Sequence, residues 1–218
     1  MKLSLETKII EPISNSKPKN AVILLHGYGG DAEDISAITL NWKRFLPETI
    51  FLCPNGHEKC PINPNGFQWF DLENNDPTYI LEESIKAEKK LNFFINEIKS
   101  EYNLNNSNIC ISGFSQGCMM SINLGLTTEE NYNCIVGFSG KLIDKKNISK
   151  RLKSKTKMLL IHGDQDVVVS PSSLLEVKDF LMRHKVNVEI KMIKNCGHNI
   201  PIEASSIALN YIKKNLYI

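Results

Sequence analysis

Residues 109–117 constrain the fold of this chain more than any other stretch. They read Ile-Cys-Ile-Ser-Gly-Phe-Ser-Gln-Gly, and a segment of helical periodicity follows at once. The apolar start suits one short buried strand, and Gly-x-Ser-x-Gly leaves room for a turn too tight for larger side chains. A hydroxyl at the tip of such a turn, here Ser115, projects into a cleft. The pattern predicts a strand, a sharp turn and a helix that present a candidate nucleophile; an incidental serine in a glycine-rich turn is the alternative.

Short apolar runs alternate with helix-period segments along the whole chain. The apolar runs predict strands at 3–10, 21–26, 49–53, 108–112, 134–139, 157–162 and 188–193. The periodic segments predict helices at 34–45, 79–102, 116–126, 171–184 and 201–216. The central strands are apolar on consecutive residues, which indicates burial on both faces. We therefore predict an α/β fold, with a mostly parallel sheet flanked by helices, in one domain spanning residues 1–218.

Composition narrows the function classes. The net charge is +2, from 26 basic and 24 acidic residues, and the lysines are scattered, which argues against nucleic-acid binding. The first residues lack the apolar core of a secretory signal, and the longest apolar run, 21–25, is too short to span a membrane. The six cysteines form no Cys-x-x-Cys pair and no metal-ligand spacing with histidine. We expect a reduced, cytoplasmic setting without metal or cofactor; pairing of Cys53 with Cys60 in an oxidising compartment is the alternative.

The connection at residues 54–78 is unusually long. It is rich in Pro, Asn and Gly and shows no obvious element of its own. Loops of this length in compact domains are usually functional or disordered. The embedded aromatic residues Phe67, Trp69 and Phe70 favour a packed excursion that partly covers a site, and an ordinary surface loop is the alternative.

Polar residues follow the predicted strands, at the edge where a parallel sheet binds ligands. Residues 26–30 read His-Gly-Tyr-Gly-Gly, and their glycines let backbone N–H groups approach a ligand oxygen. His26 itself is expected to be structural. After the strand at 157–162, Asp164 is tight against a glycine turn and is expected to cap backbone N–H groups. Asp166 lies further out, where it can reach a neighbouring loop.

His198 follows the last predicted strand and precedes a helix, a suitable place for a general base. The order Ser115, Asp166, His198 is that of a serine–acid–histidine triad. Serine is a poor nucleophile at neutral pH, so the histidine must accept its proton while the acid orients the imidazole. The backbone N–H of Gln116 and a second N–H from residues 26–30 would stabilise the oxyanion.

With these residues assembled, the chain resembles the phospholipase/carboxylesterase family, which includes acyl-protein thioesterases and small bacterial carboxylesterases. The resemblance runs through nearly the whole length and rests on the motifs His26-Gly-Tyr-Gly, Gln68-Trp-Phe-Asp, Gly113-Phe-Ser-Gln-Gly, Gly137-Phe-Ser-Gly, His162-Gly-Asp-Gln-Asp and Gly197-His. It implies an α/β-hydrolase fold with the same three catalytic residues.

The resemblance also implies oxyanion donors at the N–H groups of Tyr28 and Gln116, with Trp69 and Phe70 near an acyl pocket. It implies an enzyme without a cofactor, and relatives form homodimers. Two departures are Cys118, where many relatives have glycine or alanine, and Cys196, a thiol close to His198. The version of the motif at residues 26–31 is closer to the bacterial esterases.

The leading hypothesis is a serine hydrolase that cleaves carboxylic esters with short to medium acyl chains. Lysophospholipids and acyl-protein thioesters are alternative substrates for the same triad. A non-catalytic binding protein on this fold is a further alternative, although such proteins generally lose a member of the triad. A dienelactone-hydrolase-like enzyme is a weaker one, because those enzymes usually carry cysteine where this chain has Ser115.

Overall fold

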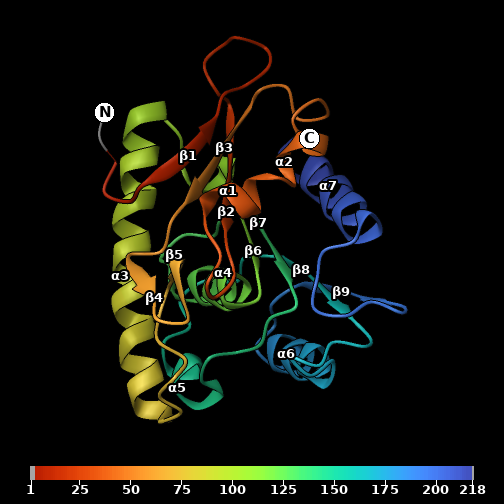
Figure 1. Cartoon of the computed structure of the whole chain (residues 1–218). Helices are drawn as coiled ribbons and strands as arrows, with labels where there is room; N and C mark the ends of the chain where they lie inside the picture. Colours follow the sequence, from red (N-terminus) through yellow and green to blue (C-terminus); the bar gives the residue numbers. More distant parts are fainter. Residues whose placement is uncertain (1–2, 218) are drawn as a thin grey trace.

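A seven-stranded sheet forms the centre of the molecule in this computed structural model, which describes residues 3–217 (Figure 1). Its spatial order is β1-β3-β2-β6-β7-β8-β9. The strands are β1 (Thr7–Ile10), β2 (Asn20–Leu25), β3 (Thr49–Pro54), β6 (Ile109–Phe114), β7 (Cys134–Phe138), β8 (Met158–Gly163) and β9 (Val188–Ile193). Only β1 at the edge pairs antiparallel; the other neighbours are parallel. The predicted α/β class with a mostly parallel sheet is confirmed.

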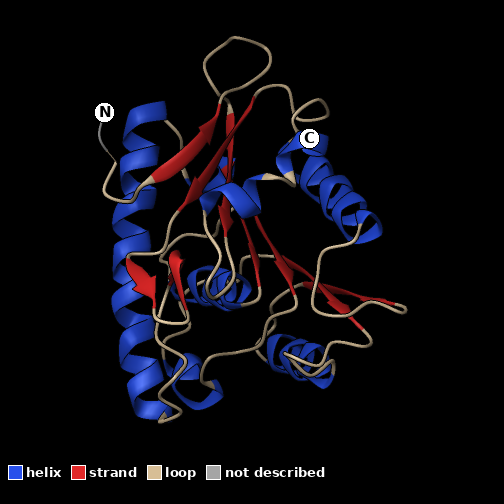
Figure 2. Ribbon diagram, in the orientation of Figure 1, coloured by secondary structure: helices blue, strands red, loops and turns tan. Residues whose placement is uncertain are grey.

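Helices cover both faces of this sheet, as a parallel sheet requires (Figure 2). One face packs on α3 (Pro77–Tyr102), α4 (Gln116–Thr127), α5 (Lys145–Lys150) and α6 (Ser172–Arg183). The other packs on α1 (Ala32–Ser36), α2 (Thr39–Trp42) and α7 (Ile202–Leu216). Successive side chains of β2 alternate between the two faces of the sheet. Ile23 and Leu25 pack on the face covered by α3 to α6, and Val22 and Leu24 pack on the face covered by α1, α2 and α7. This explains why β2 is apolar at consecutive positions.

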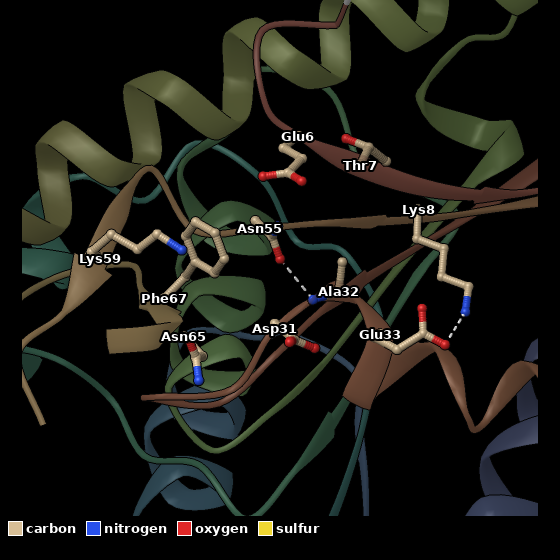
Figure 3. Close-up of a pocket in the computed structure, with 10 residues that line it drawn as sticks. All are labelled: Glu6, Thr7, Lys8, Asp31, Ala32, Glu33, Asn55, Lys59, Asn65 and Phe67. Carbon is tan, nitrogen blue, oxygen red and sulfur yellow. Dashed lines mark hydrogen bonds and ion pairs between the residues drawn. The ribbon is translucent and has the colours of Figure 1, made fainter. Parts of the chain in front are cut away.

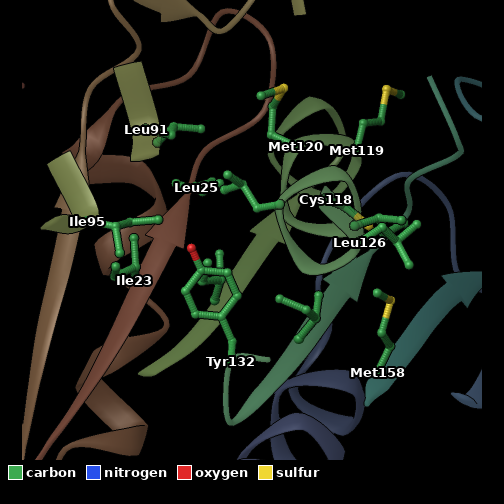
Figure 4. Close-up of a cluster of buried hydrophobic side chains, with 14 of the residues drawn as sticks. Ile23, Leu25, Leu91, Ile95, Cys118, Met119, Met120, Leu126, Tyr132 and Met158 are labelled. Atoms are coloured by element: carbon green, nitrogen blue, oxygen red, sulfur yellow. The ribbon is translucent and has the colours of Figure 1, made fainter. Parts of the chain in front are cut away.

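Helix α4 is the most deeply buried helix of the fold. All twelve of its residues are buried, and none of them is charged. Its apolar residues, with those of α3, β2 and β8, form the cluster in Figure 4. A helix without a charged face belongs in the interior. The helix that begins directly after Ser115 is therefore held on every side, which makes it a rigid support for that residue.

The excursion at residues 54–78 was predicted to have no element of its own, and this is wrong. It contains an antiparallel hairpin, β4 (Glu58–Cys60) and β5 (Asn63–Gln68), with a register shift between Lys59 and Cys60. The sequence Asn-Pro-Asn-Gly at the start of β5 has low strand propensity. Contacts with another loop stabilise the strand instead: the Phe67 N–H donates to Gly30 O, and the Gly29 N–H donates to Phe67 O.

Apart from shifts of one or two residues at the ends of elements, three further differences from the sequence prediction are found. The helix predicted at 34–45 divides into α1 and α2, and α1 begins earlier than predicted, at Ala32, where the Asp31 side chain accepts the Asp34 N–H. The strand predicted at 3–10 is confined to β1. Helix α5 was not predicted, because its residues are mostly polar and only Ile148 is buried. Among residues 3–217, no helix combines the length and apolarity needed to cross a bilayer.

Candidate active site

Ser115 occupies a strained turn between β6 and α4. Its backbone angles are φ 52° and ψ −114°, in the region that favours glycine. A Cβ atom added to Gly113 would lie 2.3 Å from the carbonyl of Gly117, and one added to Gly117 would lie 2.1 Å from Leu25 O. Both positions therefore require glycine. The strand, sharp turn and helix predicted from residues 109–117 are confirmed, with the serine at the tip.

Ser115, His198 and Asp166 form one hydrogen-bonded chain across three loops. His198 Nε2 lies 3.0 Å from Ser115 Oγ, and His198 Nδ1 lies 2.7 Å from Asp166 Oδ2. A carboxylate only accepts, so Nδ1 carries the proton and Nε2 is free to accept from the serine hydroxyl. These are the geometric relations that activation of a serine by a histidine needs. The order predicted along the sequence thus corresponds to contact in space.

Asp166 is buried and held by several donors. Its Oδ1 accepts hydrogen bonds from the N–H groups of Val168 and Val169, both at 2.9 Å. Burial pushes the pKa of Asp166 upward, but the hydrogen bonds from His198 and the two amides outweigh burial and leave this pKa below its usual value. Asp166 is therefore a carboxylate at neutral pH, able to stabilise a protonated imidazole.

The other acid and histidine of the same motif take structural positions. Asp164 Oδ1 accepts the N–H of Cys196 at 3.3 Å, as expected for a residue that caps backbone groups. His162 Nε2 donates to Val169 O at 2.9 Å and also lies 3.3 Å from Asp166 Oδ2. His162 thus supports the loop that carries Asp166 without reaching Ser115.

The loop at residues 26–30 lies directly against the nucleophile. A Cβ atom on Gly27 would be 3.3 Å from Ser115 Cβ, so the backbone approaches as closely as glycine allows. Gly29 has φ 75°, and its N–H is taken by Phe67 O. No hydrogen bond from the Tyr28 N–H is found within residues 3–217. The Gln116 N–H is at the first position of α4, where a helix provides no acceptor.

The side chain of His26 links the loop at residues 26–30 to Gly56. Its Nε2 accepts the N–H of Gly56 at 2.9 Å, so the proton is on Nδ1, which donates to Gly27 O at 2.7 Å. The ring also stacks on Trp69, with centroids 5.1 Å apart. Burial lowers the pKa of His26 and keeps the imidazole neutral. His26 is a structural residue, as expected from its sequence position.

The side chain of Gln116 joins the elbow to the long excursion. Gln116 Oε1 accepts the Trp69 N–H at 2.9 Å, and Gln116 Nε2 donates to Phe70 O at 2.6 Å. The indole N–H of Trp69 donates to His26 O at 3.0 Å. Sequence reasoning assigned Gln116 only a backbone role, because the partners of its side chain are almost fifty residues away. The Trp69 and Phe70 side chains are buried against this junction.

An open cleft of about 360 Å³ adjoins His198. Its lining residues are His26, Gly27, Tyr28, Gly30, Asp34, Ile35, Phe114, His198, Asn199 and Ile200. Trp69 and Phe70 do not line it. The Phe114 ring packs 4.8 Å from the imidazole of His198, measured between centroids. The cleft therefore brings apolar surface and the candidate base together.

A second, larger hollow of about 530 Å³ is polar and contains no member of the candidate triad (Figure 3). Lys8 forms an ion pair with Glu33 there, and the Lys59 ammonium lies 3.7 Å from the centroid of the Phe67 ring. Asn55 Oδ1 accepts the N–H of Ala32 at 2.7 Å. This hollow exceeds the cleft in volume, but the candidate triad adjoins the smaller cleft.

The fold and the site define an α/β-hydrolase. Residues 6–216 match the family model described as phospholipase/carboxylesterase. This chain belongs to the phospholipase/carboxylesterase family, as its motifs indicated, and is a hydrolase of that family.

Known proteins similar to the chain agree with this assignment. The crystal structure of esterase PE8 superposes with a TM-score of 0.92 and 30% identity, covering 99% of this chain and 100% of that one. Acyl-protein thioesterase 1 of Gibberella zeae is 27% identical, covering 89% of this chain and 90% of its own length. Esterase YpfH of Escherichia coli is 22% identical, covering 92% of this chain and 85% of its own length.

Proposed function

We propose that the protein is a serine esterase that cleaves carboxylic esters with short to medium acyl chains. The observation that carries this proposal is the hydrogen-bonded chain from Ser115 through His198 to Asp166. The family includes both esterases and thioesterases, and the triad suits either reaction. The esterase assignment is supported by the likeness to esterase PE8, which extends over nearly the whole of both chains.

In the proposed mechanism, Ser115 Oγ attacks the ester carbonyl while its proton passes to His198 Nε2. Asp166 stabilises the imidazolium, and the N–H groups of Tyr28 and Gln116 donate to the oxyanion. When the tetrahedral intermediate collapses, the C–O bond to the leaving group breaks and His198 gives that oxygen its proton. Water then attacks the acyl-enzyme with His198 as base. This second step releases the carboxylic acid and restores the Ser115 hydroxyl.

The preference for short to medium acyl chains rests on the aromatic residues packed beside the elbow. We expect Trp69 and Phe70 to close the acyl side, because both are buried next to the elbow. Lysophospholipids and acyl-protein thioesters remain the alternative substrates. A series of p-nitrophenyl esters from acetate to palmitate, with a lysophospholipid and an acyl-thioester, would rank these classes by kcat/KM.

Replacement of Ser115 by alanine tests the nucleophile. We expect Ser115→Ala to lower kcat/KM for p-nitrophenyl butyrate by at least about 10³-fold, because it removes the nucleophile that forms the acyl-enzyme. Ser112→Ala is the matched control: Ser112 is buried on β6, the strand that leads to Ser115, and its hydroxyl has no partner within residues 3–217. That control should retain activity and fold.

A fluorophosphonate probe separates an enzyme from a binding protein on the same fold. An activated serine reacts with the probe, whereas an unactivated one does not. We expect the wild-type protein to be labelled once, at Ser115, and Ser115→Ala to remain unlabelled. Full turnover by Ser115→Ala, or no labelling of the wild type, would reject the proposed function.

We also infer a reducing, cytoplasmic setting, since all six cysteines are free and buried thiols. Protein isolated without reductant, then denatured and alkylated, should carry six alkyl groups by mass spectrometry. Recovery with four groups would instead indicate a disulfide.

A further inference from the structure

The cleft beside His198 contains one carboxylate, that of Asp34, among mostly apolar walls. Ile35, Phe114 and Ile200 supply the apolar surface. Asp34 is exposed, and its Oδ2 faces the loop of the oxyanion donors: a Cβ atom on Gly30 would lie 3.7 Å from it. Within residues 3–217, no ion pair includes Asp34. A charge in the cleft without a cationic partner is available to a ligand.

The neighbouring acids are already engaged elsewhere. Asp31 caps α1 by accepting the Asp34 N–H at 2.8 Å, and Glu33 forms an ion pair with Lys8. Both line the polar hollow and neither lines the cleft. Asp34 shares with Glu33 the favourable interaction of an acidic residue with the first turn of a helix. That interaction is a structural reason for an acidic residue at this position, and it would be the same for every substrate.

The leaving group of an ester has to lie on the His198 side of the site. The imidazole must hand its proton to the departing oxygen, so that oxygen is within hydrogen-bond reach of Nε2. His198 is part of the wall of this cleft, and the Phe114 ring packs against it. A leaving group that extends from Nε2 into the cleft therefore passes between apolar walls towards Asp34.

We propose that this cleft receives the leaving group and that Asp34 makes the enzyme favour leaving groups with a positive charge, such as amino or quaternary ammonium alcohols. This inference rests on the proposed function and specifies its substrate class. The Asp34 carboxylate attracts the cation directly, and the aromatic ring of Phe114 lines the same cleft, as rings that bind ammonium groups do. Leaving groups with a phosphate or sulfonate near the ester meet repulsion instead.

The test compares two substrates of the same shape. Butyrylcholine carries a quaternary nitrogen where 3,3-dimethylbutyl butyrate carries a carbon. The ratio of their kcat/KM values in the wild type includes the intrinsic reactivity of each ester. The change of that ratio in a variant therefore isolates the effect of the side chain. Because Asp34 is exposed and screened, we expect Asp34→Asn to lower the ratio about two- to fivefold.

Asp31→Asn is the matched control. It removes the same charge three residues away, and asparagine still caps a helix. We expect this variant to keep the wild-type ratio. Asp34→Lys should lower the ratio further than Asp34→Asn and raise kcat/KM for 3-sulfopropyl butyrate, which has an anionic leaving group. Raising the salt concentration from 50 to 500 mM should reduce the wild-type ratio and leave that of Asp34→Asn nearly constant.

The outcomes separate the inference from the function on which it rests. If Ser115-dependent cleavage of the neutral ester is absent, the proposed function itself fails. If the neutral ester is cleaved but Asp34→Asn keeps the wild-type ratio, Asp34 acts only on the helix and the inference is overturned. An equal fall in the ratio with Asp31→Asn would likewise overturn it, because the effect would then come from overall charge.

Discussion

Two aspartates on one loop differ in what they can do because of where their oxygens point. Asp166 and Asp164 are two residues apart, and the sequence alone offers both as the acid of a triad. Asp166 Oδ2 contacts the imidazole of His198, whereas Asp164 Oδ1 accepts a backbone N–H from Cys196. Only the first arrangement fixes the tautomer in which Nε2 can accept a proton from serine.

At the residue scale we therefore predict opposite outcomes for the same substitution at the two positions. Asp166→Asn should lower kcat by about 10³–10⁴-fold, because an amide no longer stabilises the imidazolium and can impose the wrong tautomer. Asp164→Asn should cost less than about tenfold. Steady-state kinetics with p-nitrophenyl butyrate measures both. Comparable losses in the two variants would contradict the assignment of Asp166.

At the scale of elements, Gln116 connects the start of α4 to residues 69 and 70 of the excursion. Both polar atoms of its amide are used, and the residue is fully buried. The hairpin β4–β5 in turn pairs with the loop that carries Tyr28, through Phe67. The elbow, the excursion and the loop of oxyanion donors thus form one hydrogen-bonded unit. Geometry at Ser115 depends on all three.

We predict that Gln116→Met destabilises the protein by about 2–4 kcal/mol. The substitution keeps the backbone N–H and much of the volume, but it leaves the Trp69 N–H and Phe70 carbonyl buried without partners. Urea unfolding measures the change in free energy. Gln165→Met, at an exposed position, is the control and should shift stability by no more than about 0.5 kcal/mol. Equal stability of Gln116→Met and wild type would show that the excursion is held by other contacts.

A second element-scale prediction concerns the packing beneath the elbow. Cys118 Sγ fills the space above two glycines: a Cβ atom on either Gly137 or Gly140 would lie 2.4 Å from it. Gly137→Ala should therefore destabilise the fold by about 1–3 kcal/mol through overpacking. The double variant Gly137→Ala with Cys118→Ala should recover part of that loss, measured by thermal unfolding. No recovery would mean that the strain arises from another neighbour, such as Leu160.

At the scale of the whole molecule, the buried neutral state of His26 links global stability to pH. Burial, the main cause, lowers the pKa of His26 in the folded state, whereas the unfolded chain titrates near 6.5. Below about pH 6.5 the unfolded state binds a proton at this site that the folded state does not. Stability from this site is therefore complete above about pH 6.5 and declines as the pH falls towards the folded pKa.

We predict that the free energy of unfolding of the wild type falls between pH 7.5 and 5.5. The decline should be smaller in His26→Asn, because the titrating site is gone. His57, whose pKa is also lowered by burial, contributes with the same sign, so His57→Gln serves as the comparison. Urea titrations at both pH values give the slopes. An unaltered slope in His26→Asn would contradict a neutral, buried His26.

Much of this molecule can be predicted from its sequence because local patterns determine it. Consecutive apolar residues predict the central strands, and glycines at 113 and 117 predict the elbow where only glycine fits. Residues after strand ends gather at one edge of a parallel sheet, so Ser115, Asp166 and His198 could be predicted as a candidate triad. The motifs around them also led to the family.

Tertiary structure decided what no local pattern encodes. Strand β5 forms despite its Asn-Pro-Asn-Gly start because backbone groups of Gly29 and Gly30 pair with it. The partners of the Gln116 side chain likewise lie 46 and 47 residues away in the sequence. Asp34 lies in one cleft with His198 and Phe114 only once the chain has folded. Sequence specifies short-range preferences and residue chemistry, whereas contacts over long separations exist only once the core has packed.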